Sequence, residues 1–466
     1  MTRALDVARV DARVTSQAEI PGAMQSGWHG GWQGGWRDGV RYGGLGLPLA
    51  FVALPLYVVL PNHYAVAFGV PLAALGTLLL VARLLDAAVD PWIGRWVDAW
   101  FAAPQAGAAH HQPHQPLRQR PRRALKAAVL AGLVLAAGFA ALFHPPEVAR
   151  QTPAALLAWC AITLAITYLA YSVLAVLHQA WGARLGGDEA QRARIVSWRE
   201  GLALAGVLMT SMLPSLTGTV TTAAVFAGLL AIALVLLHRA PATQGTATQA
   251  AATHASLRLP WQGRAFRRLM AIYLVNGIAS AVPATLVLFF IRDRLQAPAF
   301  EPLFLASYFA AGALSMPLWV WLVRRLGLAP AWRLGMGLAV AAFVWAATLG
   351  AGDVVGFTVV CIASGVALGA DLALPGALLA GVVQRAGHGG QLEGAYFGWW
   401  NFATKLNLAL AAGIALPLLA AVGYTPGAQD AQALQALTIA YCLLPCALKL
   451  LAAGLLHVLW IRGEPG

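Results

Sequence analysis

Long apolar runs recur along this chain, separated by short polar connections. Each run holds about 18 residues or more, rich in Leu, Ala, Val and Gly, which is the length that a helix needs to cross a bilayer. The runs predict membrane helices at 43–60, 68–98, 124–143, 153–184, 195–214, 219–238, 267–290, 302–323, 330–349, 354–385, 394–422 and 432–460. We therefore expect an all-α membrane protein with twelve transmembrane helices.

A Thr-, Gln- and Ala-rich segment divides these spans into two groups of six. The N-terminal bundle covers 43–238, the linker 239–266 and the C-terminal bundle 267–466. Residues 1–42 form a polar tail rich in Gly and Trp. The glycines argue against a stable helix in this tail, so we expect its tryptophans to rest on the bilayer surface.

The distribution of basic residues predicts the orientation in the membrane. Lys and Arg concentrate in the even-numbered connections, whereas the odd-numbered ones carry only Arg150, Arg292 and Arg294. Positively charged loops stay on the cytoplasmic side of a membrane. We therefore expect both termini in the cytoplasm and the protein in a bacterial-type inner membrane.

The composition supports a membrane protein and narrows the function. With 59% hydrophobic and 11% charged residues, an ordinary soluble protein is excluded. The formal charge of +13 comes from basic loops, so we interpret it as topology rather than nucleic-acid binding. No nucleophile–base pair or phosphate-binding loop is present in the sequence, and we expect neither an enzyme nor a cofactor. The expected partners are the lipid bilayer and a small-molecule substrate, and the expected state is a monomer.

The second predicted span carries three charges on one face. Arg83, Asp86 and Asp90 are spaced i, i+3 and i+7 and so share one stripe of the helix. Each would cost about 2.5–3.5 kcal/mol at the centre of a membrane helix, so such groups usually mark an ion or substrate path. The stripe has a surplus negative charge, which a bound Na⁺ or H⁺ would cancel. The alternative is a structural ion-pair cluster that locks the bundle.

Residues 83–98 follow the pattern R-x-x-D-x-x-x-D-P-x-x-G-x-x-x-D. This pattern resembles the second-helix signature of the glycoside-pentoside-hexuronide:cation symporters, a family of the major facilitator superfamily. Residues 393–406 resemble the eleventh-helix block of that family, and 171–183 with Arg199 give a weaker match. The resemblance covers residues 42–460. It implies two bundles around a central cavity that opens alternately to either side, driven by a co-transported cation.

The resemblance also implies roles for individual residues. The carboxylates of Asp86 and Asp90 would bind Na⁺, Li⁺ or H⁺, and Lys405 would couple this site to the other bundle, with Arg83 setting the charge balance. We treat Lys405 as the one lysine deep in a predicted span, where it needs an anionic partner, and Asp86 and Asp90 are its natural partners. A salt bridge that only packs two helices is the alternative.

The end of the second span and the loop after it predict a cytoplasmic gate. We expect its acid to pair with basic residues in one conformation and to release them in another. The residues of this predicted gate are Gly94, Asp98, Arg120, Arg122 and Arg123. A role in folding and topology is the alternative. The histidines at 110–114 in the same loop leave metal binding open beside a solvated insertion.

Polar and aromatic side chains within the spans predict the lining of the substrate cavity. The expected residues are Tyr168, Tyr171, His178, Trp181, Arg199, Asp371, Tyr396, Trp400 and Asn401. Aromatic faces suit sugars and amphipathic molecules equally. The resemblance departs from melibiose-type members in one respect, because the first and fourth spans lack the carboxylates that bind the sugar there.

We therefore expect a secondary transporter coupled to Na⁺ or H⁺ that moves a small organic solute, with sugars and glycosides as the first candidates, by alternating access. A second hypothesis keeps the cation coupling and replaces the cargo with a lysolipid or another amphipathic molecule. A third hypothesis is a membrane sensor or scaffold that transports nothing.

Overall fold

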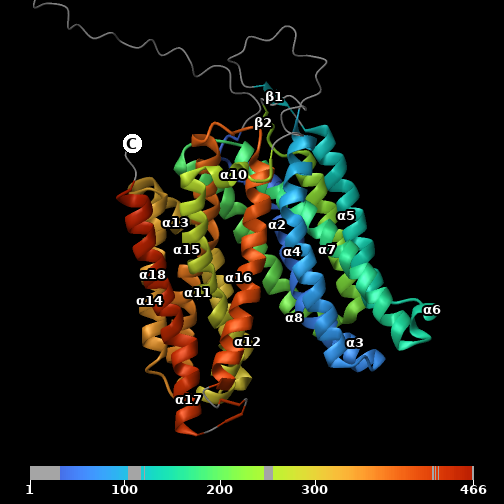
Figure 1. Cartoon of the computed structure of the whole chain (residues 1–466), viewed down its shortest axis with the longest axis vertical. Helices are drawn as coiled ribbons and strands as arrows, with labels where there is room; N and C mark the ends of the chain where they lie inside the picture. The colour runs from blue at the N-terminus through green and yellow to red at the C-terminus, as the bar shows by residue number, and fades with distance from the viewer. Residues whose placement is uncertain are drawn as a thin grey trace, which may run out of the picture.

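The computed structural model describes residues 32–102, 117–119, 121–245, 256–421, 424–425, 427–428 and 430–463. In this part of the chain, long helices lie side by side in two groups (Figure 1). The N-terminal half contains α1 (Trp36–Gly43), α2 (Gly46–Leu54), a π-helical turn (Pro55–Val59), α3 (Leu60–Phe68), α4 (Leu72–Phe101), α5 (Arg122–Phe143), α6 (Glu147–Arg150), α7 (Pro153–Arg184) and α8 (Glu189–His238).

The C-terminal half repeats this pattern of long helices with short breaks. It contains α10 (Leu259–Gln262), α11 (Arg264–Phe289), α12 (Glu301–Leu314), α13 (Met316–Leu326), α14 (Leu328–Ala346), α15 (Val354–Arg385), α16 (Glu393–Ala421), α17 (Ala431–Thr438) and α18 (Leu444–Leu456). π-Helical turns continue α11, α17 and α18 at Phe290–Arg294, Ile439–Leu443 and His457–Ile461, and a 3-10 turn at Pro298–Phe300 precedes α12.

Seven helices of the described chain are long and apolar enough to cross a membrane, or up to eight if α12 and α13, which bend by 42° at their junction, form one span. Some of these helices begin at residues that favour a helix start. For example, the Thr152 Oγ1 accepts the Ala155 N–H at 3.1 Å at the start of α7, and Pro153 occupies its first turn. The predicted spans 195–214 and 219–238 form one long helical run, interrupted at Gly218 by a φ of 80° that favours glycine.

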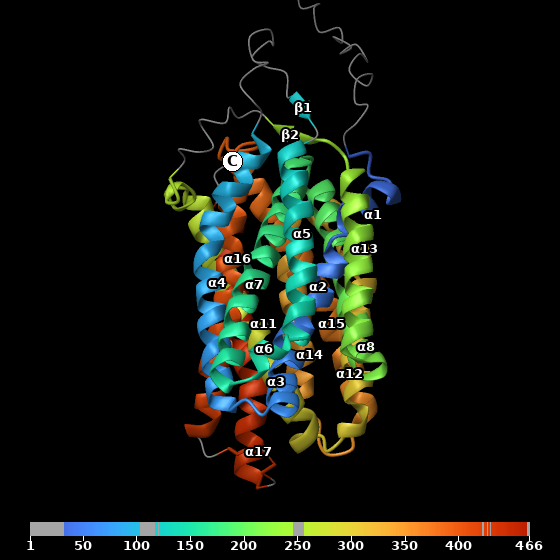
Figure 2. The ribbon, with the colours of Figure 1, turned by 90° about the vertical axis from the view of Figure 1, so that its right-hand side faces the viewer.

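Two short strands qualify the all-α prediction. β1 (Leu117–Gln119), in the loop after α4, pairs antiparallel with β2 (Thr243–Gly245), in the linker, and Leu117 lies opposite Gly245. The pairing connects two polar segments whose backbone groups would otherwise face water. We call the end of the molecule that carries β1 and β2 the strand end; the C-terminus also lies there, and α3 and α17 lie at the opposite end (Figures 1 and 2).

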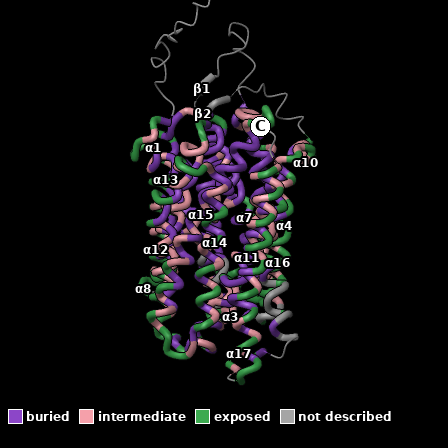
Figure 3. The backbone as a smooth tube through the Cα atoms, turned by 90° about the vertical axis from the view of Figure 1, so that its left-hand side faces the viewer, coloured by how far each residue is buried: buried purple, intermediate pink, exposed green. Residues whose placement is uncertain are grey.

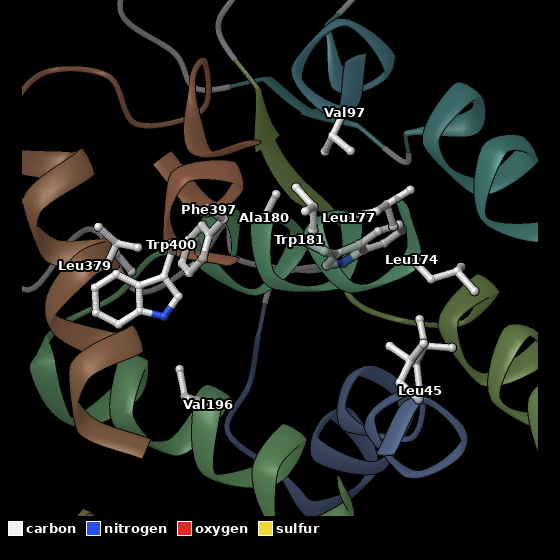
Figure 4. Close-up of a cluster of buried hydrophobic side chains, with 14 of the residues drawn as sticks. Leu45, Val97, Leu174, Leu177, Ala180, Trp181, Val196, Leu379, Phe397 and Trp400 are labelled. Atoms are coloured by element: carbon white, nitrogen blue, oxygen red, sulfur yellow. The ribbon is translucent and has the colours of Figure 1, made fainter. Parts of the chain in front are cut away.

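The two halves meet along α4 and α16 and along α8 and α15. In Figure 1 the ribbons of α4 and α16 run together near the strand end and diverge toward α3 and α17. Near the strand end, buried apolar side chains of both halves form one core, in which Phe397 and Trp400 of α16 face Ala180 and Leu177 of α7 (Figure 4). This shared core closes the strand end.

The outer surface of the helices is apolar over much of its height, as expected against lipid. Exposed positions alternate with buried ones along the outer helices (Figure 3). Large exposed apolar side chains occur on both halves, including Leu80, Leu133, Leu216, Leu334 and Leu450. A water-soluble protein would bury such residues, whereas lipid chains solvate them.

The end of the predicted tail differs from the prediction. Residues Trp36–Gly43 form the helix α1, and the Trp32 ring is buried edge-on against Tyr42 instead of lying on the bilayer surface. The glycines explain the difference, because a Cβ at Gly39 would lie 2.2 Å from the ring of Trp198 on α8. Glycine therefore lets α1 dock directly on this tryptophan. Residues 1–31 of the tail lie outside the described residues.

Candidate cation site and gate

Lys405 of α16 lies between the two aspartates of α4. Its Nζ is 2.7 Å from Asp86 Oδ2 and 2.8 Å from Asp90 Oδ2. It also donates to Ser172 Oγ on α7 at 2.8 Å, and this hydroxyl donates to Asp86 Oδ1 at 2.7 Å. The cluster therefore joins three helices, two from the N-terminal half and one from the C-terminal half. We call Asp86, Asp90, Ser172 and Lys405 the interhalf cluster.

Glycines bring α4 and α16 close enough for these contacts. A Cβ at Gly398 would lie 2.6 Å from the carbonyl oxygen of Asp90, and one at Gly94 would lie 2.1 Å from the carbonyl oxygen of Gly394. Such distances leave no room for any side chain. The backbones thus touch, and Lys405, two turns beyond Gly398, reaches across to the aspartates.

The interhalf cluster has more negative than positive charge and little contact with water. The Asp90 side chain is fully buried, that of Asp86 is 5% exposed and that of Lys405 is 17% exposed. Two carboxylates and a hydroxyl are oxygen donors of the kind that hard cations prefer. One lysine cannot neutralise two carboxylates. A monovalent cation bound between Asp86 and Asp90 would supply the missing positive charge.

Arg83 lies one turn from Asp86 and is exposed. It interacts with Tyr168 of α7, which is itself buried. The amine that contacts both aspartates is Lys405, so part of the charge of the carboxylates is balanced from the opposite half. The predicted role of Arg83 in setting the charge balance stays a prediction.

A second buried ion-pair cluster joins the halves at the strand end. Arg184, at the end of α7, lies 2.7 Å from Asp98 of α4 and 3.1 Å from Glu393 of α16. The Asp98 carboxylate also accepts the N–H groups of Gly394 and Ala395 at 2.7 and 2.8 Å, at the start of α16. A helix N-terminus favours an anion. Asp98, Arg184 and Glu393 form what we call the strand-end clasp.

In this conformation the acid of the predicted gate pairs with a residue outside the predicted set, and its pairing with the predicted arginines stays a prediction. Asp98 pairs with Arg184, whereas Arg122 and Arg123 are exposed at the start of α5. Arg184 is favoured because its guanidinium is buried and stacks 4.2 Å from the Phe101 ring. Arg120 and the histidines at 110–114 lie outside the described residues.

Three predicted cavity residues are buried in packed contacts instead. The His178 Nε2 lies 2.8 Å from the carbonyl oxygen of Tyr42, and the Trp181 indole N–H donates to the carbonyl of Pro241 at 3.3 Å. Tyr396 Oη lies 2.9 Å from Nδ1 of His388, a loop residue whose pKa burial lowers. Each polar tip has a partner in the closed strand end, so none of them lines a cavity in this conformation.

Other predicted residues do lie where the halves meet. Asn401 of α16 donates to Gln179 of α7 at 2.9 Å, and the ring of Trp400 stacks on Tyr273 of α11 with centroids 3.6 Å apart. Tyr171 is half-buried. These side chains surround the same region as the interhalf cluster.

Glu200 is a further charged residue of this region that the sequence pattern did not single out. The Arg199 Nη2 lies 2.6 Å from Glu200 Oε1, and these side chains are 11% and 20% exposed. A Cβ at Gly376 of α15 would lie 3.7 Å from the same Arg199 nitrogen, so the pair faces the other half. Glu200 interacts electrostatically with both Tyr171 and Tyr273. Its position beside Arg199, one turn into a predicted span, was the available signal.

Lys449 was also overlooked. The interpretation of Lys405 as the one lysine deep in a span was wrong, because Lys449 lies in α18 and is 4% exposed. Its amine forms an ion pair with Asp371 of α15 and donates to Asn276 Oδ1 and Ser280 Oγ of α11 at 2.8 and 2.9 Å. Trp332 of α14 donates its indole N–H to Asp371 at 2.9 Å. We call these five residues the C-half cluster.

The fold, the interhalf cluster and the strand-end clasp can now be compared with known proteins. A model of the family described as MFS/sugar transport protein matches residues 41–462. The chain belongs to this family. It is therefore a multi-pass membrane transporter of the major facilitator type, and not an enzyme. The motif resemblance found in the sequence is confirmed at the level of this family.

Individual relatives agree with this assignment. The inner membrane symporter YicJ of Escherichia coli (strain K12) is 25% identical over 274 residues, which are 55% of this chain and 55% of that protein. The aligned stretch thus spans about half the length of this curated relative. Together with the apolar helices, this comparison indicates a multi-pass inner membrane protein.

Solved structures share the fold at low identity. A bacterial homologue of the iron transporter ferroportin, in an outward-facing state, has a TM-score of 0.65 and 15% identity, covering 91% of this chain and 99% of that one. The transporter FucP, in its outward conformation, has a TM-score of 0.62 and 14% identity, covering 90% and 98%. These similarities define the architecture.

Proposed function

We propose that this protein is a cation-coupled secondary transporter of a small organic solute, with sugars and glycosides as the leading class. It would use twelve spans in two six-helix halves with both termini in the cytoplasm. The observation that carries the proposal is the position of Lys405 between Asp86 and Asp90, across the boundary of the two halves. The family description and a relative named as a symporter support it.

The coupling step follows from the charges of the interhalf cluster. A monovalent cation that enters between Asp86 and Asp90 competes with Lys405 for the same carboxylates. Once the cation neutralises them in part, the attraction that holds α16 against α4 weakens. Either Na⁺ or H⁺ meets this requirement, because each adds one positive charge to the site.

The strand-end clasp indicates which end of the transporter is closed before the cation binds. Asp98, Arg184 and Glu393 hold the strand end closed in this conformation. In this proposal the basic loops face the cytoplasm, so the arrangement would correspond to a transporter closed toward the cytoplasm. The neighbours described as outward-facing share this fold. Cation and solute binding would shift the equilibrium toward the state in which the clasp is broken.

The solute site in this proposal lies between the halves, beside the interhalf cluster. Glu200 and Arg199 offer a carboxylate and a guanidinium that are partly exposed, and the partly buried ring of Tyr273, which stacks on Trp400, lies beside them. Hydroxyl groups of a sugar pair with charged and amide side chains while its apolar face rests on an aromatic ring. Glu200 thus supplies the acidic group that the first and fourth spans lack.

The test is uptake into proteoliposomes that contain the full-length protein. Radiolabelled sugars and glycosides are offered with an inward Na⁺ gradient, an inward H⁺ gradient or neither. We expect one cation gradient to stimulate uptake of at least one sugar, and Asp90→Asn to remove the stimulation. A lysolipid in the same assay tests the second hypothesis, and absence of any transport across the panel would favour the sensor or scaffold.

A further inference from the structure

A groove opens on the outer surface between α8 and α13, close to the strand end. Its volume is about 500 Å³, and its walls come from both halves of the transporter. Leu202 and Met316 give it apolar walls, whereas Arg194 and Arg324 are its charged residues. Figure 2 shows α1, α8 and α13 together along one edge of the molecule near the strand end.

The two arginines leave donors available to an anion. The Arg194 Nη1 donates to the carbonyl oxygen of Gly34 at 3.1 Å, which fixes the side chain and leaves its other N–H groups. Arg324 is exposed. The nearby carboxylate of Glu189 accepts the Leu328 N–H at 2.9 Å at the start of α14, so it is already engaged. The charged part of the groove is therefore basic.

Aromatic residues place this part of the groove at a membrane surface. Trp198 and Trp321 belong to its lining, and the Trp321 ring is about half exposed beneath the guanidinium of Arg325, 5.0 Å away. Tryptophans and arginines in this order are typical of the level of lipid headgroups. Below them the walls are apolar, as acyl chains require.

We propose that this groove binds an anionic phospholipid, with its phosphate on Arg194 and Arg324 and its acyl chains along the apolar walls between α8 and α13. Arginine forks bind phosphate oxygens in pairs, and basic pockets between membrane helices suit anionic headgroups. Because α8 belongs to one half and α13 to the other, a lipid seated there contacts both. Bound lipid then favours the closed strand end seen in this structure over a state in which the halves separate.

The test uses the purified full chain in mild detergent with added phosphatidylglycerol or phosphatidylcholine. Native mass spectrometry measures how much of each lipid stays bound. We expect phosphatidylglycerol to bind more tightly, with a loss of about fivefold in Arg324→Gln and about thirtyfold in the double variant with Arg194→Gln, from roughly one basic contact each. Arg264→Gln is the control, since this exposed arginine at the start of α11 is outside the groove lining.

Each outcome decides the proposal. Selective binding that Arg324→Gln weakens and Arg264→Gln preserves supports it. Equal retention of the two lipids, or equal loss in Arg264→Gln and Arg324→Gln, would overturn it. Because Arg324 is exposed, its replacement leaves the fold intact even if Arg194→Gln does not. Free inorganic phosphate, added in place of lipid, should not compete at equal concentration if the acyl chains contribute.

Discussion

Two lysines within the helices of this transporter, the partly buried Lys405 and the buried Lys449, have similar partners and different surroundings. Lys405 pairs with two aspartates and connects α16 of the C-terminal half to α4 and α7 of the N-terminal half. Lys449, on α18, pairs with one aspartate on α15, and the other members of the C-half cluster, on α11 and α14, also belong to the C-terminal half. One cluster crosses the boundary that must move during transport, and the other lies within a single bundle.

The charge balance differs in the same sense. The C-half cluster contains one carboxylate and one amine, and amide, hydroxyl and indole groups complete its hydrogen bonds. The interhalf cluster has one carboxylate more than it has amines. A balanced, fully bonded cluster has no need of a further cation, whereas an unbalanced one gains from binding it. The comparison therefore separates a cluster that stabilises a bundle from one that can respond to a cation.

The largest effect is expected from breaking the C-half cluster on one side. Lys449→Met leaves the Asp371 carboxylate buried without its ion-pair partner, and we expect the folded state to lose about 3–5 kcal/mol. Thermal unfolding of the purified protein measures this loss. The control is Lys126→Met, an exposed lysine on α5, which should stay within about 0.5 kcal/mol.

Removing both members of the pair should restore much of that stability. Apolar replacement of a whole buried ion pair is often neutral, so Lys449→Met with Asp371→Leu should approach the wild-type unfolding temperature. Cation-dependent uptake by this double variant would place the C-half cluster outside the coupling step. Loss of coupling in a stable double variant would contradict the comparison.

The next effect concerns transport rather than stability. Asp90→Asn removes the surplus charge of the interhalf cluster, so a cation gains nothing by entering, and we expect cation-stimulated uptake to fall about 100-fold or more. Initial rates in proteoliposomes measure it. The control is Glu301→Gln, which removes an acid paired with Arg292 outside the cluster. Stimulation that survived Asp90→Asn would assign the coupling cation to another site.

The features of the two clusters that depend on neighbouring residues in the sequence could be predicted, whereas those that depend on distant residues could not be predicted from a local pattern. The spacing of Asp86 and Asp90 on one helical face is a local signal, and both side chains contact Lys405 in the structure. The pairing with Lys405 spans 315 positions and came from the resemblance of residues 393–406, not from spacing. Arg184 and Glu200 went unrecognised as partners because their roles depend on which helices pack together, which no local pattern specifies. The docking of α1 could not be predicted for the same reason, because its glycines fit against Trp198, a residue far along the chain.

A smaller effect should follow from loosening the strand-end clasp. Arg184→Gln leaves Asp98 and Glu393 close together without a cation, and we expect the closed state to lose about 2 kcal/mol relative to the open one. Spin labels at positions 122 and 264, in opposite halves, should report longer distances. Arg192→Gln is the matched control, because Arg192 also bridges the halves but donates to the neutral amide of Gln384 at 2.8 Å. An unchanged distance distribution in Arg184→Gln would remove the clasp from the gate.

The smallest effect is expected at the proposed solute site. Glu200→Gln keeps the shape of the side chain and removes its charge, so we expect the KM for the solute to rise about tenfold while uptake stays dependent on the cation. Uptake kinetics over a range of solute concentrations separate this from Asp90→Asn, which should lose the cation dependence itself. An unchanged KM would move the solute away from the pair Arg199–Glu200.

The central claim is that a cation binds between Asp86 and Asp90 in competition with Lys405. The most direct measurement is binding of radiolabelled Na⁺, and of H⁺ by proton uptake from weakly buffered solution, to purified wild-type protein, Asp90→Asn and the double variant Lys449→Met with Asp371→Leu. We predict that wild type and the double variant bind the same cation and that Asp90→Asn does not. Cation binding retained by Asp90→Asn, or lost only in the double variant, would contradict the claim.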